Sequence, residues 1–177
     1  MTDLIAHPLQ AGTASIVISP PVGTLMQGYG VRRATSIADQ TLATALAVGN
    51  GRIAWLLLSV DAIGLDRSFT QRVRRTIARR LRMNPSEITI NCSHTHSGPA
   101  TLSHLGQVRA DNVYLGLLEE RLGVVAENAA AHRQPVRWHF GTTSLTENVN
   151  RRLRVHDRIE LGVDSTGQCD RGRGAFD

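Results

Sequence analysis

Two histidines, His94 and His96, are the residues of this sequence whose chemical type and spacing could support metal binding or acid–base catalysis. They lie in the segment 88–99, which reads ITINCSHTHSGP. Side chains alternate between the two faces of a strand, so Cys92, His94 and His96 are predicted to share one face. The Gly-Pro pair that follows breaks the strand. We therefore expect both imidazoles to reach a point just beyond the sheet edge, where open α/β sheets often place their sites.

A pair of this kind can bind a metal ion. Neutral imidazole is a good zinc ligand, and a second imidazole beside it can act as an acid, a base or a hydrogen-bond donor. Two histidines with structural roles in a core or on a surface would have the same spacing, so both interpretations stay open at this point. Cys92 could add a ligand, although such a cysteine is more often a small buried hydrophobe.

The hydrophobic pattern predicts the strands that must position this pair. We expect a glycine-bearing loop at 23–30 and strands at 14–18, 42–48, 52–60, 87–95, 135–140 and 158–163. Asn50 and Gly51 favour a tight hairpin between the second and third of these strands. The strand 52–60 is apolar on both faces, so we expect it to be central and covered on both sides.

Two helices are also predicted. Asp66 is expected to cap the first, which the Asn84-Pro85 pair should end. Its apolar residues recur every four positions and form one stripe: Phe69, Val73, Ile77 and Leu81. The second helix is expected at 114–132. Strands that alternate with helices, together with a hairpin, predict an α/β fold with a mixed β-sheet layered with helices.

The composition excludes several functions. All twenty basic residues are arginine and none is lysine, which removes lysine Schiff-base chemistry and the phosphate-binding loop that needs a lysine. Two cysteines cannot build a disulfide framework, and the N-terminus lacks the pattern of a secretory signal. The longest apolar run, 53–58, is far shorter than a membrane span. We therefore expect a cytoplasmic protein.

The residues around the histidine pair resemble a known family. The segment 93–99, SHTHSGP, is similar to the THTHSGP element of the neutral/alkaline non-lysosomal ceramidases, zinc-dependent amidases that cleave the N-acyl bond of ceramide. Three further segments match in the same order. The first, within 11–30, contains AGTA, ISPPVG and MQGYG; the second is LLSVDAIGL at 57–65; the third is NVNRR at 148–152. Four ordered matches are a specific signal, whereas the two histidines alone are not.

The resemblance implies a role for each matched residue. His94 corresponds to a zinc ligand, His96 to the imidazole that contacts the polar head of the substrate near the metal, and Arg151 to an arginine that fixes the same head group. The implied cofactor is zinc and the implied partner is a ceramide-like lipid amide, with transient contact to a membrane surface. The family mechanism is attack of a zinc-activated water on the amide carbonyl.

The resemblance also implies that much of the family's site has no counterpart here. The other ligands of that zinc, a second histidine, a glutamate and a tyrosine, find no matching position in the 177 residues. A catalytic zinc normally needs three protein ligands. We therefore expect 1–167 to be the N-terminal part of a ceramidase-like catalytic domain, 168–177 to be a disordered tail, and the isolated chain to be inactive or incomplete.

The sequence also permits other interpretations. A non-enzymatic, arginine-rich fragment that binds nucleic acid is the alternative, and it would show affinity that falls steeply with salt. The arginines near 72–80 form either such a cationic face or a solvated helix surface. Asp61 is expected to cap a loop, and Gly28 and Gly30 to supply backbone freedom beside the pocket. Three other histidines have no partner spacing and are expected to be structural or solvent-facing: His104, His139 and His156.

Overall fold

A computed structural model describes residues 8–103, 108–144 and 152–161 of the chain. The chain divides into two compact units, Met1–Arg137 and Trp138–Asp177, and each is described by itself. The first unit holds the main sheet, both helices and the histidine pair. The expected boundary at 167 and the tail 168–177 lie outside the described residues.

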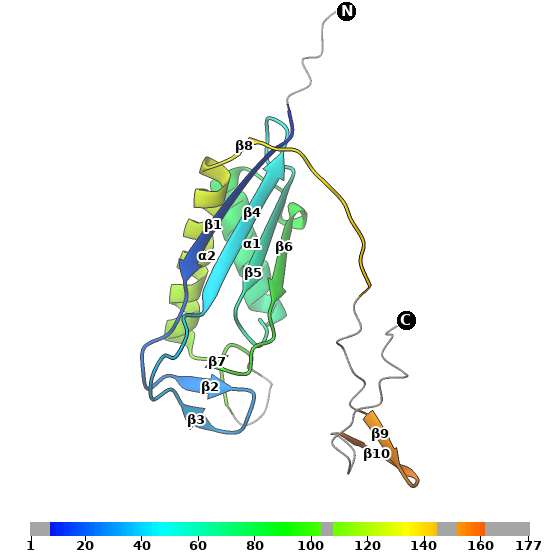
Figure 1. Cartoon of the computed structure of the whole chain (residues 1–177). Helices are drawn as coiled ribbons and strands as arrows, with labels where there is room; N and C mark the ends of the chain where they lie inside the picture. The colour runs from blue at the N-terminus through cyan, green and yellow to red at the C-terminus, as the bar shows by residue number, and fades with distance from the viewer. Residues whose placement is uncertain (1–7, 104–107, 145–151, 162–177) are drawn as a thin grey trace, which may run out of the picture. The chain divides into compact units, whose positions relative to one another are not determined.

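A mixed five-stranded sheet forms the centre of the first unit (Figure 1). In spatial order its strands are β6 (Ile88–Cys92), β5 (Trp55–Val60), β4 (Leu42–Gly49), β1 (Gln10–Val17) and β8 (Gln134–Pro135). The β5–β6 pair is parallel and the other pairs are antiparallel. A parallel pair needs a crossover connection, and the chain between β5 and β6 supplies one that contains a helix.

Both helices, α1 (Arg67–Leu81) and α2 (Asn112–Ala131), lie on the same face of this sheet, behind it in Figure 1. Every second residue of β4 and β5 points into the layer between sheet and helices, as the alternation of side chains along a strand requires. The fully buried residues of that layer are small on β4, large on β5, and mostly large on the helices: Ala43, Ala45, Ala47, Leu56, Leu58, Val60, Val73, Leu118, Leu122, Val125, Ala126 and Ala129.

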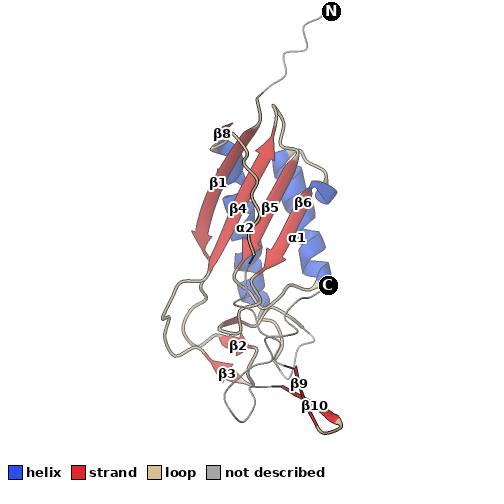
Figure 2. Ribbon diagram, turned by 45° about the vertical axis from the view of Figure 1, so that its right-hand side comes forward, coloured by secondary structure: helices blue, strands red, loops and turns tan. Residues whose placement is uncertain are grey.

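Two smaller sheets complete the described structure. Strands β3 (Arg32–Arg33), β2 (Leu25–Gln27) and β7 (Gly98–Pro99) form a three-stranded sheet. Figure 2 shows β2 and β3 beyond the end of the main sheet toward which β6 points. The second unit contains a hairpin of β9 (Arg152–Val155) and β10 (Arg158–Leu161). A short 3-10 helix, η1 (Pro85–Glu87), precedes β6.

The aspartates at the N-termini of the two helices make different hydrogen bonds. The Asp111 carboxylate accepts hydrogen bonds from the backbone N–H groups of Val113 and Tyr114, which caps α2. Asp66 occupies the expected N-cap position of α1, but its side chain accepts from the backbone N–H of Ser103 instead. The helix α1 ends at Leu81, and its C-cap Arg82 has a left-handed φ of 53°, two residues before the Asn84-Pro85 pair that was expected to end the helix.

The fold class predicted from the sequence, α/β with a mixed sheet and helices, is confirmed. Several strands differ from the prediction. The loop expected at 23–30 contains β2, and the strand expected from 135 to 140 ends at Pro135. The prediction of a tight two-residue hairpin at Asn50 is also wrong, because the pairing of Val48 with Trp55 leaves a longer loop between β4 and β5.

The expectation that β5 is covered on both faces is wrong as well. Leu56, Leu58 and Val60 are buried under the helices, whereas Trp55 and Ser59 on the other face are exposed. No described helix or strand of residues 8–137 covers that second face. In the described part of the chain, no helix is long and apolar enough to cross a membrane.

The burial pattern predicts the residues on which stability depends. We expect Leu58→Ala to lower the free energy of unfolding by about 2–5 kcal/mol, because it removes a fully buried side chain and leaves a cavity. Urea denaturation followed by circular dichroism measures this change. Val113→Ala, at a position 85% exposed on α2, is the matched control and should change stability by less than about 0.5 kcal/mol. Equal effects of the two substitutions would contradict the assigned core.

Candidate functional site

The histidine pair lies on a loop, not on the strand where the sequence pattern predicts it. β6 ends at Cys92, two residues before the first histidine. His94 has a left-handed φ of 60°, a conformation that L-residues seldom adopt and that cannot continue a strand. Its backbone N–H donates to the carbonyl of Ala62, just past the end of β5. Backbone strain of this kind is concentrated at functional sites.

A hydrogen bond fixes the imidazole of His94. Its Nδ1 lies 2.6 Å from the carbonyl oxygen of Ile63. A carbonyl oxygen only accepts, so Nδ1 carries the proton and donates it, and Nε2 keeps its lone pair in the neutral ring. Histidines that bind metals usually show this arrangement, with one ring nitrogen held by a carbonyl or carboxylate and the other facing the metal. His94 is exposed, so Nε2 is accessible.

His96 lies beside His94 in spite of the turn between them. The two ring centroids are 4.9 Å apart with an angle of 69° between the ring planes. The ring of Tyr29 contacts His96 edge-on from another side, at 4.8 Å. His96 Nδ1 is buried and has no hydrogen-bond partner among the described residues. An unpaired buried ring nitrogen is costly, and a polar or metal partner at this position would remove the cost.

The segment 28–32 packs closely behind His96. A Cβ atom added at Gly28 would lie 2.7 Å from the Cβ of His96, and the φ of Gly28 is +125°. A larger residue at position 28 would therefore displace the imidazole. The sequence predicts backbone freedom for Gly28, and the structure shows that glycine is also needed for this close approach. The Arg32 guanidinium donates to the backbone carbonyl of His96 and lies 5.6 Å from the centre of the Tyr29 ring.

Gln27 anchors the chain that follows the histidines. It is only 2% exposed, and its amide nitrogen donates to the carbonyls of Leu102 and Val108. Its amide oxygen accepts from the backbone N–H groups of Thr101 and Leu102. One side chain from β2 therefore satisfies four backbone groups of a segment some 75 residues away in sequence. Gln27 and Tyr29 lie in the matched MQGYG segment, but no periodic pattern in the sequence indicates that they or Arg32 support the histidines.

A groove of about 480 Å³ lies directly beside the histidine loop. Thr95, Ser97 and Asp61 form part of its wall, together with the exposed loop 34–41. The Asp61 carboxylate accepts from the backbone N–H of Leu42, 2.9 Å away, and so joins the ends of β4 and β5. The prediction that Asp61 caps its own loop is wrong, because the carboxylate bonds to the first residue of β4 instead.

The residues present fit one part of a zinc site. His94 offers a fixed imidazole with an available Nε2, and His96 stands next to it with an unpaired buried nitrogen. Among the described residues no group of three His, Cys, Asp or Glu side chains could hold a metal ion. Arg151 and His104 lie outside the described residues, so their predicted roles stay predictions, and His139 and His156 are exposed as expected.

The environment of Cys92 argues against a role as a third metal ligand. It packs against the hydrophobic core, and burial raises the pKa of its thiol above the ordinary value. The thiolate is the form that binds metals, and it is disfavoured here. The interpretation of Cys92 as a small hydrophobe is therefore the better supported one.

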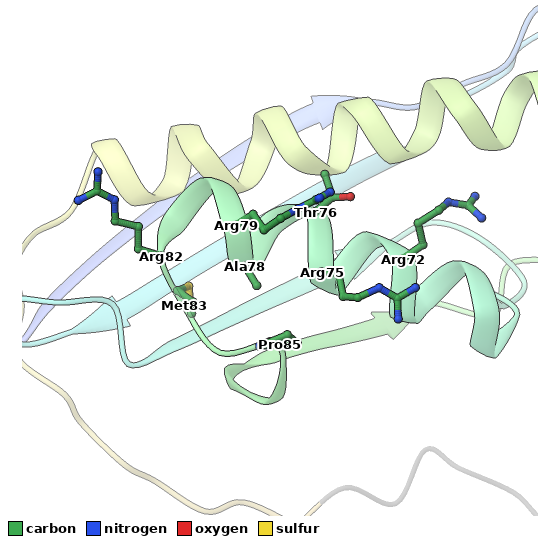
Figure 3. A pocket seen from close by; sticks show the side chains of 8 residues that line it. All are labelled: Arg72, Arg75, Thr76, Ala78, Arg79, Arg82, Met83 and Pro85. Atoms are coloured by element: carbon green, nitrogen blue, oxygen red, sulfur yellow. The ribbon is translucent and has the colours of Figure 1, made fainter.

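A second hollow, of about 470 Å³, lies on α1 away from the histidines. Figure 3 shows the arginines that surround it, which come from α1 and the turn after it: Arg72, Arg75, Arg79 and Arg82. Arg72 pairs with Glu119 at 2.7 Å, and the neighbouring Arg80 pairs with Glu120 and Glu127. These ion pairs join α1 to α2. Part of the cationic face therefore has a structural role.

The hydrogen bonds of Gln27 lead to a test of the loop. We expect Gln27→Leu to speed amide hydrogen exchange at Thr101 and Leu102 and to lower the free energy of unfolding by about 1–3 kcal/mol, because buried backbone groups lose their partners. Hydrogen exchange followed by mass spectrometry measures the first effect. Gln71→Leu, at an exposed position on α1, should leave both quantities unchanged. Unaltered exchange at 101–102 in Gln27→Leu would refute the anchoring role.

The raised pKa of Cys92 leads to a second test. In a Cys169→Ser background, alkylation of Cys92 by iodoacetamide should rise with pH through a midpoint above that of a free cysteine, because burial disfavours the thiolate. Rates measured from pH 7 to pH 10, with free cysteine as the reference, give that midpoint. A midpoint at or below the reference would mean that the thiol is activated, and would restore Cys92 as a candidate ligand.

Comparison with solved structures identifies similar folds. The chain resembles neutral ceramidase from Pseudomonas aeruginosa with a TM-score of 0.60 and 19% identity over 73% of its residues. It resembles a ceramidase in complex with C2 with a TM-score of 0.64 and 17% identity over the same share. The chain spans only 22% of the length of each. No family model and no curated protein matches the sequence. The described chain thus has the fold of a part of the neutral ceramidases, as its sequence motifs suggested.

Proposed function

We propose that this chain carries part of the active site of a zinc-dependent hydrolase of the ceramidase type, which cleaves the N-acyl amide bond of ceramide or a related lipid amide. The observation that carries the proposal is the state of His94: its Nδ1 donates to the Ile63 carbonyl and its Nε2 remains available beside the ring of His96. The fold similarity to two solved ceramidases adds support.

The roles proposed for the residues follow from their positions. His94 holds the metal through Nε2, and the Ile63 carbonyl fixes the orientation of its ring. When bound, zinc would polarise the amide carbonyl and lower the pKa of a water molecule. His96 contacts the polar head of the substrate, and Tyr29 and Arg32 keep its ring and backbone in place. Arg151 is proposed to fix the same head group as a permanent multi-donor.

The isolated 177-residue chain is proposed to be incomplete. One imidazole with an available Nε2 does not reach the three protein ligands that a catalytic zinc normally has. The described residues provide no third donor near the pair. We therefore expect weak zinc binding and no amide turnover from this chain alone. No observation favours the nucleic-acid alternative, and two of the arginines that it would use, Arg72 and Arg80, pair with glutamates.

Metal binding tests the proposal directly. We expect calorimetry to detect zinc binding to the purified chain, and His94→Ala to weaken it at least about tenfold, since a ligand contributes more than a residue that merely orients one. His132→Ala, which removes an exposed histidine at the end of α2, should bind zinc as the wild type does. Equal zinc affinity in the wild type and in His94→Ala would overturn the assignment of His94.

The substrate class needs a separate readout. A short-chain ceramide, added to the zinc-loaded protein, should bind more weakly to His96→Ala than to the wild type, while zinc affinity changes much less. This split is expected because His96 is assigned to the substrate and His94 to the metal. A loss of zinc affinity in His96→Ala as large as in His94→Ala would instead make both imidazoles ligands.

A further inference from the structure

The two imidazoles of the histidine pair differ in how the protein holds the ring nitrogen Nδ1. In His94 this nitrogen lies 2.6 Å from the carbonyl oxygen of Ile63. In His96 it is enclosed and has no hydrogen-bond partner among the described residues. A neutral imidazole carries one proton, and its surroundings decide which nitrogen holds it. That choice decides whether Nε2 offers a lone pair or an N–H group.

The surroundings of His96 Nδ1 favour a lone pair over an N–H group. A proton on this nitrogen would create a buried donor with no acceptor among the described residues. Among backbone groups, buried N–H groups without an acceptor are rarer than carbonyl oxygens with an unused lone pair, and the same desolvation cost applies to ring nitrogens. The neutral ring therefore avoids the larger penalty by keeping its proton on the other nitrogen, Nε2.

Arg32 favours the same form of the ring. Its guanidinium donates to the backbone carbonyl of His96 and lies over the ring of Tyr29. Nδ1 is the ring nitrogen covalently nearer to the backbone, so it belongs to the end of the residue that binds this positive charge. A positive charge attracts a lone pair and repels the hydrogen of an N–H group. The described hydrogen bonds of Arg32 go to backbone oxygens, so none of them occupies Nδ1.

Nε2 of His96 is the ring nitrogen that a ligand can reach. His96 is partly exposed, and its enclosed ring nitrogen is Nδ1. In His94 the available nitrogen is likewise Nε2, because Nδ1 is held by the Ile63 carbonyl. The two ring centroids are 4.9 Å apart. Neighbouring rings therefore offer the same nitrogen, but with a lone pair on one ring and a hydrogen on the other.

We propose that the two rings are held in opposite tautomers: His94 with its proton on Nδ1, and His96 with its proton on Nε2. Zinc binds a lone pair, whereas an oxygen atom accepts a hydrogen bond from an N–H group. In the neutral pair, His96 is therefore a hydrogen-bond donor to a ligand oxygen and not a second metal ligand. That oxygen is a carbonyl or hydroxyl oxygen of the lipid amide, and this part alone rests on the proposed function.

Nuclear magnetic resonance of the zinc-free chain with ¹⁵N-labelled histidine tests the tautomers. At about pH 9, where an ordinary imidazole is neutral, two-bond correlations within each ring identify the nitrogen that carries the proton. His94 should show the proton on Nδ1 and His96 on Nε2, with signals assigned from His94→Ala and His96→Ala. The exposed His139 supplies the reference for a ring that exchanges between both forms. A His96 proton on Nδ1, or averaged as in His139, would overturn the proposal.

Addition of zinc to the same sample separates the roles of the two rings. The Nε2 signal of His94 should move on zinc binding, while His96 keeps its proton on Nε2. Loss of that proton, with a shift of the His96 Nε2 signal as large as that of His94, would make both rings ligands and overturn the proposal. If neither ring responded to zinc, the proposed function would fail, whereas the tautomers would still be decided by the zinc-free spectrum.

A matched pair of variants tests the donor role. Glutamine places an amide N–H group at about the distance of Nε2, whereas methionine has similar length and no donor. With zinc-loaded protein, His96→Gln should bind a short-chain ceramide within about threefold of the wild type, and His96→Met at least about tenfold more weakly. Circular dichroism of both variants should match the wild type. Equal losses in the two folded variants would refute the donor role.

Discussion

The parallel pairing of β5 with β6 is the constraint on which the candidate site depends. It places the carboxyl ends of two strands side by side, so the chain leaving β5 and the chain leaving β6 meet at one edge of the sheet. Backbone hydrogen bonds continue past the strands, from Ser93 to Val60 and from His94 to Ala62. The Ile63 carbonyl therefore reaches the ring of His94. Carboxyl ends of parallel strands are where open sheets commonly place functional groups.

The helices and long strands could be predicted because their signals are strong and local. A four-residue apolar period extends through α1, and alternation of small buried residues extends through β4. The strands β2, β3 and β7 are two or three residues long, too short for any period to be seen. They form because β2 and β3 pair with each other and β2 pairs with β7, which lies more than 60 residues later in the chain, and pairing between distant segments leaves no local pattern.

The site was predictable in its residue types and only partly in its geometry. The motif identified His94 and His96, and the structure brings their rings within 4.9 Å of each other. It does so through a left-handed turn at His94, which side-chain alternation along a strand cannot indicate. The supporting residues Gln27, Tyr29 and Arg32 come from a segment more than 60 residues earlier, so only the tertiary structure reveals them.

The close approach of Gly28 to His96 has a consequence for how this part of the molecule tolerates change. A side chain at position 28 would meet the Cβ of His96 at 2.7 Å, and the backbone there has a φ of +125°, which favours glycine. Both restrictions fall on one residue, so the identity of residue 28 and the position of the His96 ring cannot vary independently.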